Sequence, residues 1–546
     1  MVYSNEVSVS DPVENRTVRE VLERQLRERP DQLAIRDLNE ALTYRELFER
    51  SCQASGGFTA LGVQRGDGVL LMLDNHVDYI LSWFGLSLMG AVEVPVNTAY
   101  RGSFLSHVIN DSGAAVLVVE DSYLPLIADV RDQLTGLNTI LVRGGEGDFP
   151  HIEGVAISAF DGVLAGEPVE PVEVNSWDLL GILYTSGTTG NSKGVLAPQG
   201  LAYSYSSPKW IEPGEVVMCN LPLFHIGGQW AGVYSALIAG GSSVILPRFS
   251  ATTFWEDVRR FGCTQALILG AMASFLAAQP EQENDNDHTL RHINMVPLVA
   301  DHEAFAERFG VSIGAAYGLT EFSAPVLTLY GDAEPGLAGR LRSDFEARIV
   351  DEHDIDVPVG KTGELVLRAK VPWAMMAGYH GLPDKTSEAW RNLWFHTGDA
   401  MRQDEQGRYF FVDRNNDAMR VRGENISSVE VEKEIDSHPE VVASVAVAVP
   451  SQHTEDESKV AVVRKKGSTL TPEDLLRYLV PRMPYFMVPR YFDFVSELPM
   501  TPTHKFKKAE VRAAGITATT WDRSAAGFSV TRKGLEEPNG ATAVSA

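Results

Sequence analysis

A short segment rich in glycine and hydroxyl side chains offers the clearest chemistry in this chain. Residues 184–195 read Tyr-Thr-Ser-Gly-Thr-Thr-Gly-Asn-Ser-Lys-Gly-Val. Glycines allow tight turns in which backbone N–H groups converge on an anion, and a lysine adds a mobile positive charge. The apolar run 179–183 before it is typical of a buried strand. The segment therefore predicts a polyphosphate-binding loop at a strand end, formed by Thr185, Ser186, Gly187, Thr188, Thr189, Gly190 and Lys193.

Two other interpretations of this segment are weaker. A flexible surface loop is also rich in Gly, Ser and Thr, but such loops rarely follow a buried strand with this ordering. A Walker phosphate loop needs a glycine, then four other residues, then Gly-Lys-Ser/Thr. The Gly-Lys-Thr at residues 360–362 has Ile355 at that position. We expect residues 360–362 to form a turn before the strand 364–367.

Further segments supply groups that suit a nucleotide. Residues 317–321 (Tyr-Gly-Leu-Thr-Glu) give an aromatic face, a hydroxyl and a carboxylate that could bind Mg²⁺. Asp399 follows a strand-like stretch and suits ribose hydroxyls. Arginines occur at residues 413–414 and 420–425, and Lys505 lies further along. Each segment alone is ordinary, since an isolated Thr-Glu or Gly-Asp is usually a cap or a turn. Their number and order favour a shared site.

Composition excludes several classes of function. The chain has 546 residues, enough for two to four domains, with 44% hydrophobic and 22% charged residues. Its net charge of −26 argues against broad nucleic-acid binding and against docking on anionic lipid. The three cysteines have no metal-binding spacing, which indicates reduced thiols in a cytoplasmic protein. We expect neither a secretory signal nor a membrane span.

Strand-like and helix-like runs alternate through most of the chain. The stretch 17–29 predicts an amphipathic helix, and 77–89 predicts another after the strand 68–73. This alternation predicts an α/β fold, with a large N-terminal domain of several subdomains and mainly parallel sheets over residues 1–413. A shorter α+β pattern predicts a small mobile domain at 414–515. Residues 516–546 are rich in Ala, Thr, Ser and Gly and predict a disordered tail.

The order of these segments resembles that of the adenylate-forming enzymes. This superfamily holds acyl-CoA synthetases, peptide-synthetase adenylation domains and firefly luciferase. The resemblance runs from about Thr17 to Arg512, nearly the whole chain. Within the superfamily, the pattern is most similar to the crotonobetaine/carnitine-CoA ligase-like enzymes. The further matching motifs are LTYREL at 42–47, GAVEVPVN at 90–97, LPLFHIGG at 221–228, VDR at 412–414, RGENIS at 422–427 and FMVP at 486–489.

The resemblance implies an ATP-dependent carboxylate–CoA ligase. A carboxylate oxygen would attack the α-phosphorus of ATP, and pyrophosphate would leave. The resulting acyl-adenylate would then react with the thiol of CoA. By this resemblance, the loop 185–194 cradles the β- and γ-phosphates. The other implied roles are adenine stacking for Tyr317 beside Gly318, the α-phosphate for Thr320, Mg²⁺ for Glu321, the ribose for Asp399 and Arg414, and bridging of carboxylate and α-phosphate for Lys505.

The second half-reaction is implied to need a movement of the small domain. A hinge at Asp413 would withdraw Lys505 and bring the turn Arg422-Gly423-Glu424 to the site. His225 would lie at the thiol tunnel and the acyl pocket, although an ordinary hydrogen-bonded histidine is the alternative. The other expected pocket residues are Gly227, Gly228 and Met295, with the reservation that such glycines equally suit close helix packing.

Departures from the family pattern leave alternatives open. Many relatives have Gly-Gly-Ala-Pro where this chain has Met-Val-Pro-Leu-Val-Ala at 295–300, and His504 replaces the glycine before the catalytic lysine. No carboxylate in 224–230 could pair with an amino-acid ammonium, which favours a free-standing CoA ligase. A stand-alone enzyme that loads a carrier protein and a catalytically inactive nucleotide-binding homologue are the alternatives. The acid and a homodimeric state stay open.

Overall fold

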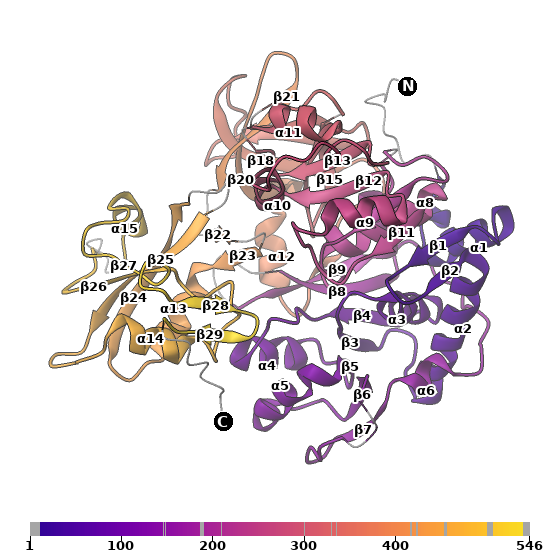
Figure 1. Ribbon diagram of the computed structural model, residues 1–546, viewed down its shortest axis with the longest axis horizontal. Coiled ribbons are helices and arrows are strands. Elements are labelled where there is room, and N and C mark those ends of the chain that lie inside the picture. Colours follow the sequence, from indigo (N-terminus) through magenta and orange to yellow (C-terminus); the bar gives the residue numbers. More distant parts are fainter. Residues whose placement is uncertain are drawn as a thin grey trace.

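The chain folds into a large N-terminal part and a smaller C-terminal part beside it (Figure 1). The computed structural model describes residues 11–145, 147, 149–185, 191–208, 210–299, 301–328, 330–334, 336–414, 418–421, 424–451, 456–499 and 506–538. For seven of these it describes the backbone alone, namely 413, 414, 418, 420, 425, 427 and 429. The domain boundary expected at Asp413 stays a prediction, since residues 415–417 are outside the description.

One large sheet is mainly parallel and contains the strands that flank the glycine-rich segment. Its eight strands have the order β19-β9-β8-β4-β3-β5-β6-β7. The strands from β8 to β7 in this order are parallel, whereas β9 and β19 pair antiparallel. The bounds are β3 Gly68–Met72, β4 Val92–Pro95, β5 Val116–Glu120, β6 Thr139–Arg143, β7 Ala156–Ala159, β8 Leu179–Thr185, β9 Lys193–Pro198 and β19 Gly378–Tyr379.

The other large sheet combines a parallel half with an antiparallel half. Its thirteen strands have the order β17-β18-β20-β21-β16-β15-β14-β13-β12-β10-β11-β1-β2, and the run from β14 to β1 is parallel. The bounds are β1 Leu33–Arg36, β2 Ala41–Thr43, β10 Val216–Cys219, β11 Ser242–Ile245, β12 Gln265–Leu269, β13 His292–Val296, β14 Ser312–Leu319, β15 Ser323–Thr328, β16 Leu337–Leu341, β17 Phe345–Val350, β18 Thr362–Ala369, β20 Phe395–Gln403 and β21 Arg408–Arg414.

Helices pack between and around these sheets. The expected amphipathic helix is α1, in which Thr17 caps the first turn by accepting a hydrogen bond from the Glu20 N–H. In α3 every residue except Asp78 is buried, and its side chains share one core with β1 and β3. The bounds are α1 Val18–Glu28, α2 Tyr44–Ala60, α3 Val77–Leu88, α4 Gly102–Asp111, α5 Leu124–Asp129, α6 Asp161–Leu164, α7 Gln199–Ser206, α8 Ser235–Ala239, α9 Phe254–Phe261, α10 Gly270–Ala277, α11 His302–Phe309 and α12 Pro383–Ala389.

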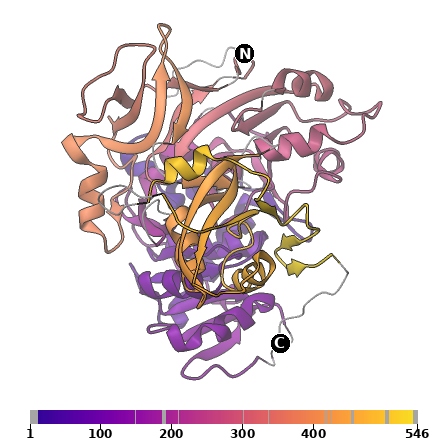
Figure 2. The same cartoon turned by 90° about the vertical axis from the view of Figure 1, so that its left-hand side faces the viewer.

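The small C-terminal part has the α+β composition that the sequence predicts. A hairpin, β22 and β23, precedes a four-stranded sheet of order β24-β25-β26-β27. Figures 1 and 2 both show α15 on the side of this part that faces away from the large N-terminal part. The bounds are β22 Ala418–Val421, β23 Glu424–Ser427, α13 Ser428–Asp436, β24 Val441–Pro450, β25 Asp456–Arg464, α14 Pro472–Leu479, β26 Tyr491–Val495, α15 Lys508–Ala513 and β27 Trp521–Asp522.

The expected disorder of residues 516–546 is wrong for 516–538. This stretch contains β27 and the hairpin of β28 (Ser529–Thr531) and β29 (Gly534–Glu536). Phe528, Val530 and Leu535 are buried in the same core as the small domain. The composition of this stretch predicts disorder, but these few apolar residues are enough to attach a short hairpin. Residues 539–546 lie outside the described part.

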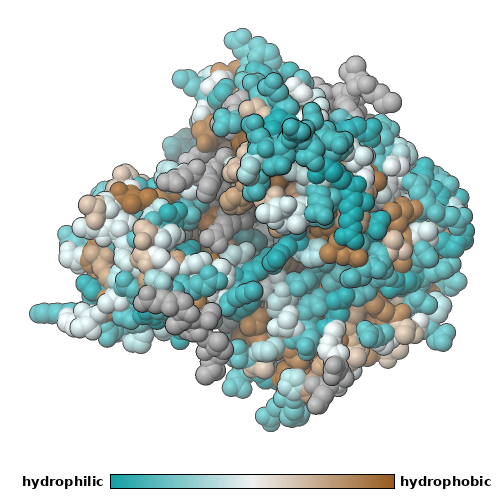
Figure 3. All heavy atoms as spheres, in the orientation of Figure 1, coloured by the Kyte–Doolittle hydropathy of each residue, from teal (hydrophilic) through white to brown (hydrophobic). Residues whose placement is uncertain are grey.

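The hydrophilic surface agrees with the charged composition, and the free cysteines agree with the expected reduced thiols. Hydrophilic side chains cover most of the face in Figure 3. Cys52, Cys219 and Cys263 are free and buried. Among the described helices, none combines the length and the apolar character needed to cross a bilayer.

Candidate active site

A large cavity collects residues from both big sheets and from the small domain. Its volume is about 1130 Å³. The strands that reach it are far apart in sequence, and the small domain contributes Glu424. The expected site residues that line it are Thr185, Lys193, His225, Gly227, Gly318, Thr320, Glu321, Asp399 and Glu424.

The glycine-rich segment connects two antiparallel neighbours, β8 and β9. Thr185 ends β8 and pairs in register with Lys193, which begins β9. Lys193 is therefore held in a strand, with its Nζ 4.1 Å from the centre of the Tyr379 ring. Burial lowers the pKa of Lys193, and the nearby Glu321 opposes this shift. Residues 186–190 of the loop lie outside the described part of the chain.

Tyr379 is a cavity residue that the sequence analysis missed. Its hydroxyl donates a hydrogen bond to Glu321 Oε1 at 3.0 Å, and its ring faces Lys193. Burial raises the pKa of the Tyr379 phenol, and the Glu321 charge adds to this rise. Tyr379 thus holds the carboxylate and the ammonium in fixed positions beside each other. Its strand, β19, has two residues, too few for any periodicity to mark it.

Tyr317 and Asp399 are brought together from β14 and β20. The Tyr317 hydroxyl donates to Asp399 Oδ2 at 2.6 Å. Asp399 is 2% exposed and lines the cavity, whereas Tyr317 does not line it, although its neighbours Ala316 and Gly318 do. The backbone register places Arg414 directly across from Asp399 on β21.

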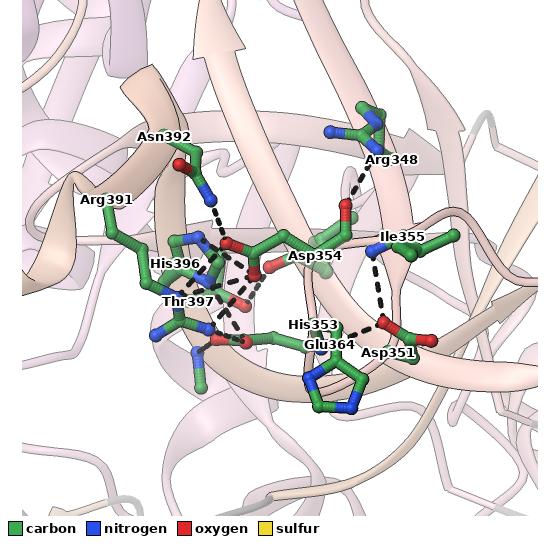
Figure 4. A network of polar contacts seen from close by, with 12 residues as sticks. Arg348, Asp351, His353, Asp354, Ile355, Glu364, Arg391, Asn392, His396 and Thr397 are labelled. Atoms are coloured by element: carbon green, nitrogen blue, oxygen red, sulfur yellow. Dashed lines mark hydrogen bonds and ion pairs between the residues drawn. The ribbon is translucent and has the colours of Figure 1, made fainter.

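A polar network of Asp354, Glu364, Arg391 and His396 (Figure 4) supports β20, the strand that also carries Asp399. Glu364 on β18 accepts a hydrogen bond from the Gly398 N–H at 3.0 Å and lies 3.0 Å from His396 Nδ1. Arg391 contacts Glu364 at 3.2 Å and Asp354 at 3.3 Å. Gly398 has a φ of 72° and lies at the irregular position of β20 before Asp399, a backbone conformation that favours glycine. No sequence pattern marked Glu364 as a site residue, because its contacts are cross-strand.

His225 precedes an unusual helical segment. The π-helix η4 (Gly227–Tyr234) follows it, and such π turns often occur at functional sites. The Gly227 N–H donates to His225 Nδ1 at 3.1 Å, which leaves the proton of a neutral imidazole on Nε2. His225 is exposed within the cavity lining.

Two expected pocket residues do not line the cavity. Met295 is fully buried in the core on the other face of β13, while its strand neighbours Asn294 and Val296 line the cavity. The prediction for Met295 is wrong because adjacent strand residues point to opposite faces. A Cβ on Gly228 would lie 2.3 Å from the Pro222 carbonyl oxygen. Gly228 therefore serves close packing, the alternative role considered for it.

The small domain meets the cavity with the beginning of β23. Glu424 lies within reach of Asn97, with Asn97 Nδ2 3.5 Å from Glu424 Oε1. Arg422, Gly423, His504 and Lys505 lie outside the described residues. On either side of residues 500–505, the Lys507 N–H donates to the Pro499 carbonyl at 2.8 Å.

Helix α13 holds the small domain against the large one. Ser103 Oγ donates to Glu434 Oε1 at 2.5 Å, and Lys433 Nζ lies 3.4 Å from Asn191 Oδ1. Glu430 is 5% exposed and accepts a hydrogen bond from the Ser192 N–H, next to the glycine-rich loop. Burial raises the pKa of Glu430 to about 8.

Sequence comparison with known proteins matches both parts of the chain. The family described as AMP-binding enzyme matches residues 22–380, and the family described as AMP-binding enzyme C-terminal domain matches residues 430–505. A crotonobetaine/carnitine–CoA ligase of Salmonella heidelberg (strain SL476) is 31% identical over 488 residues, which cover 86% of this chain and 93% of the relative. The ligase of the same name from Salmonella typhimurium gives the same values.

Solved structures have the same architecture. An anthranilate CoA ligase in complex with anthranoyl-AMP has a TM-score of 0.69 and 25% identity, covering 92% of this chain and 98% of that one. An o-succinylbenzoate CoA synthetase from Bacillus subtilis has a TM-score of 0.78 at 22% identity, covering 90% and 98%, and shows the fold alone. The chain therefore belongs to the AMP-binding enzyme family, as an adenylate-forming enzyme of the AMP-forming acid–thiol ligase class.

Proposed function

We propose that this protein joins a carboxylic acid to coenzyme A at the expense of ATP. In the first step the carboxylate oxygen forms a bond to the α-phosphorus, and the bond to the pyrophosphate leaving group breaks. In the second step the CoA sulfur bonds to the acyl carbon, AMP leaves, and the thiol proton is released. The observation that carries this proposal is the single cavity that joins Lys193, Glu321 and Asp399 with Glu424 of the small domain.

The β- and γ-phosphates are proposed to bind at the loop between β8 and β9. Thr185 and Lys193 are the described members, and residues 186–190 complete the loop. Glu321 offers carboxylate oxygens, the ligands that Mg²⁺ prefers, beside the phosphate site. When bound there, Mg²⁺ would neutralise phosphate charge. In the described ranges, no group of three or more His, Cys, Asp or Glu could hold a metal.

The nucleoside is proposed to lie along β14 and β20. Asp399 would accept hydrogen bonds from the ribose hydroxyls, with Arg414 across from it, and Tyr317 would stack on the adenine. Gly318 lines the cavity, and a Cβ there would lie 3.1 Å from the Tyr205 ring. This crowding shows that protein packing requires a glycine at position 318, which leaves the backbone bare where it lines the cavity.

Catalysis would come from positioning and charge stabilisation, with little acid–base chemistry. Thr320 would contact the α-phosphate, and Lys505 would bridge it to the carboxylate in one orientation of the small domain. After rotation about Asp413, the turn of Arg422, Gly423 and Glu424 would serve the thiol step. His225 and Gly227 would line the junction of thiol tunnel and acyl pocket.

The acyl group is proposed to lie against a largely apolar wall. Tyr205, Trp210, Ala316 and Ala324 form one small cluster that lines the cavity. Ala231 on η4 adds another small side chain. This wall supports an acid whose body is uncharged. Separately, the protein's free cysteines support activity in a reducing compartment such as the cytoplasm.

A panel of carboxylic acids tests the proposed function. We expect pyrophosphate release from ATP and Mg²⁺ with one class of acid, and a CoA thioester when CoA is added. The panel should span aliphatic, aromatic, steroid-like and betaine acids, each with and without CoA. Release that CoA neither accelerates nor converts to a thioester would contradict a CoA ligase and favour a carrier protein as acceptor.

Replacing Asp399 with asparagine tests the nucleotide site. We expect Asp399→Asn to raise the KM for ATP by roughly ten- to a hundredfold, because a charge-assisted hydrogen bond to the ribose is weakened. The KM for the acid should change little. Pyrophosphate exchange measures the two KM values when the ATP and acid concentrations are varied in turn. The matched control is Tyr317→Phe, which keeps the ring and loses the hydroxyl bonded to Asp399. Equal KM values for ATP in Asp399→Asn and wild type would contradict this role.

A further inference from the structure

The segment after the matched C-terminal domain is firmly attached to the small domain. The family match ends at residue 505, whereas the described chain continues over 506–538. Arg490 makes a two-pronged ion pair with Asp522, at 3.1 and 3.0 Å. Arg477 Nε lies 2.9 Å from Glu537 Oε1, beyond the last strand. The hairpin β28–β29 between these anchors must therefore move with the small domain.

The hairpin presents two neighbouring cations at its tip. Thr531 pairs with Gly534, so that Arg532 and Lys533 form the two-residue turn between β28 and β29. Val530 and Leu535 are buried and fix the two strands, while both tip side chains are exposed. Within the described part of the chain, the Lys533 ammonium has no ion pair.

This tip lines the catalytic cavity across the domain boundary. Val530, Thr531, Arg532 and Lys533 belong to the cavity wall together with Glu424. The Arg532 guanidinium lies 5.8 Å from the centre of the Tyr485 ring. It also interacts electrostatically with Asp74 and Tyr123 of the large domain. Figure 1 shows β28 and β29 where the small domain faces the large one.

The tip is too far from the phosphate loop to bind the same triphosphate. Asp74 follows β3 and Tyr123 follows β5, whereas Lys193 begins β9. In the sheet order β9-β8-β4-β3-β5 these strands are three and four steps apart. At about 4.8 Å a step, the separation is roughly 14 to 19 Å. Arg532 and Lys533 thus form a second basic region of the cavity, in a chain with a net charge of −26.

We propose that the hairpin tip binds the phosphate groups of the CoA nucleotide. The inference rests on the proposed function, with CoA as the acceptor. Two adjacent, exposed cations suit a multiply charged phosphate ligand, and Arg248 on the large domain lines the same cavity. Because the hairpin moves with Glu424, it serves the thiol step and leaves adenylate formation to the other residues.

The test compares two double variants that lose the same charge. Arg532→Ala/Lys533→Ala removes the tip cations. Lys465→Ala/Lys466→Ala removes two exposed cations from another turn of the small domain that does not line the cavity. For both and for wild type, the KM values for CoA and for 3′-dephospho-CoA are measured, together with acid-dependent pyrophosphate exchange in the absence of CoA.

We expect the tip variant to raise the KM for CoA roughly tenfold, the size of about one lost charge-assisted contact. Pyrophosphate exchange and the control variant should stay near wild type. A smaller rise with 3′-dephospho-CoA would assign the 3′-phosphate to the tip, and an equal rise would assign the pyrophosphate. An unchanged KM for CoA in the tip variant, or an equal loss of pyrophosphate exchange, overturns the inference. Wild-type enzyme that forms no CoA thioester overturns the proposed function itself.

Discussion

Replacing Lys505 with alanine is expected to lower acyl-adenylate formation by roughly two to three orders of magnitude. The reason is electrostatic, because a lysine between carboxylate and α-phosphate stabilises charge that develops in the transition state. Removal of one such preorganised group typically has an effect of about this size. ATP binding should be largely kept, since Lys193, Glu321 and Asp399 remain in the cavity.

The arrangement of the small domain predicts a split between the two half-reactions. Glu424 lies in the cavity, whereas α15, which begins three residues after Lys505, lies on the far side of the small domain (Figure 2). Adenylation by Lys505 would therefore need a different orientation of this domain. Lys505→Ala should spare the reaction of CoA with an acyl-adenylate supplied from outside.

Two assays separate these outcomes. Pyrophosphate exchange reports adenylation, and thioester formation from added acyl-adenylate and CoA reports the thiol step. Lys507→Ala is the control, since Lys507 is two residues away and pairs with Glu510 at the surface. If Lys505→Ala exchanges pyrophosphate at the wild-type rate, the role of Lys505 is wrong. If both assays fall equally, the split between orientations is wrong.

Most of the site could be predicted because its residues lie in contiguous sequence motifs. Lys193, Glu321 and Asp399 come from three such segments and line one cavity. Met295 shows the limit of this reasoning. A motif locates the strand β13 but does not fix which alternate residues face the cavity, and a one-residue phase error exchanges Met295 for Asn294.

Other cavity residues left no local signal. Tyr379 contacts Glu321 in the turn between β14 and β15, and Glu364 contacts Gly398 on the neighbouring strand β20, so both act on residues far along the chain. Such contacts depend on sheet order, which a single sequence does not reveal. The hairpin at 529–536 was missed for a different reason, because its flanks have the composition of a disordered tail while two buried side chains, Val530 and Leu535, hold it in place.

Glu430 is expected to make the thiol step sensitive to pH. Its pKa is raised from 4.5 to about 8 by burial between α13 and the large domain. The groups around it are the Ser192 N–H, Lys433 and the buried Tyr100, of which the first two favour its charged form. We call the domains docked when α13 packs against the large domain, as in this structure. Glu430 holds its proton in the docked state and releases it when the domains separate, so docking is most favourable below pH 4.5. It weakens as the pH rises to about 8 and changes little beyond.

Ionisation of Glu430 is expected to weaken the docking of the two domains strongly. The interval from 4.5 to about 8 corresponds to a penalty on the order of 5 kcal/mol at full ionisation, as an upper bound. Glu430→Gln keeps an acceptor for the Ser192 N–H and removes the ionisation. We therefore expect the variant to form thioester faster than wild type, with a ratio that grows tenfold or more between pH 6 and pH 9.

The ratio of variant to wild type is the quantity to measure, because ionisation of the CoA thiol affects both enzymes alike and cancels. Thioester formation from supplied acyl-adenylate isolates the docked arrangement from adenylation. Glu434→Gln removes the same charge from the same helix, where Glu434 accepts a hydrogen bond from Ser103, and controls for charge loss alone. A Glu430→Gln ratio that stays constant from pH 6 to pH 9 would contradict the role of Glu430, since a neutral side chain gains its advantage only where the carboxylate is forced to ionise.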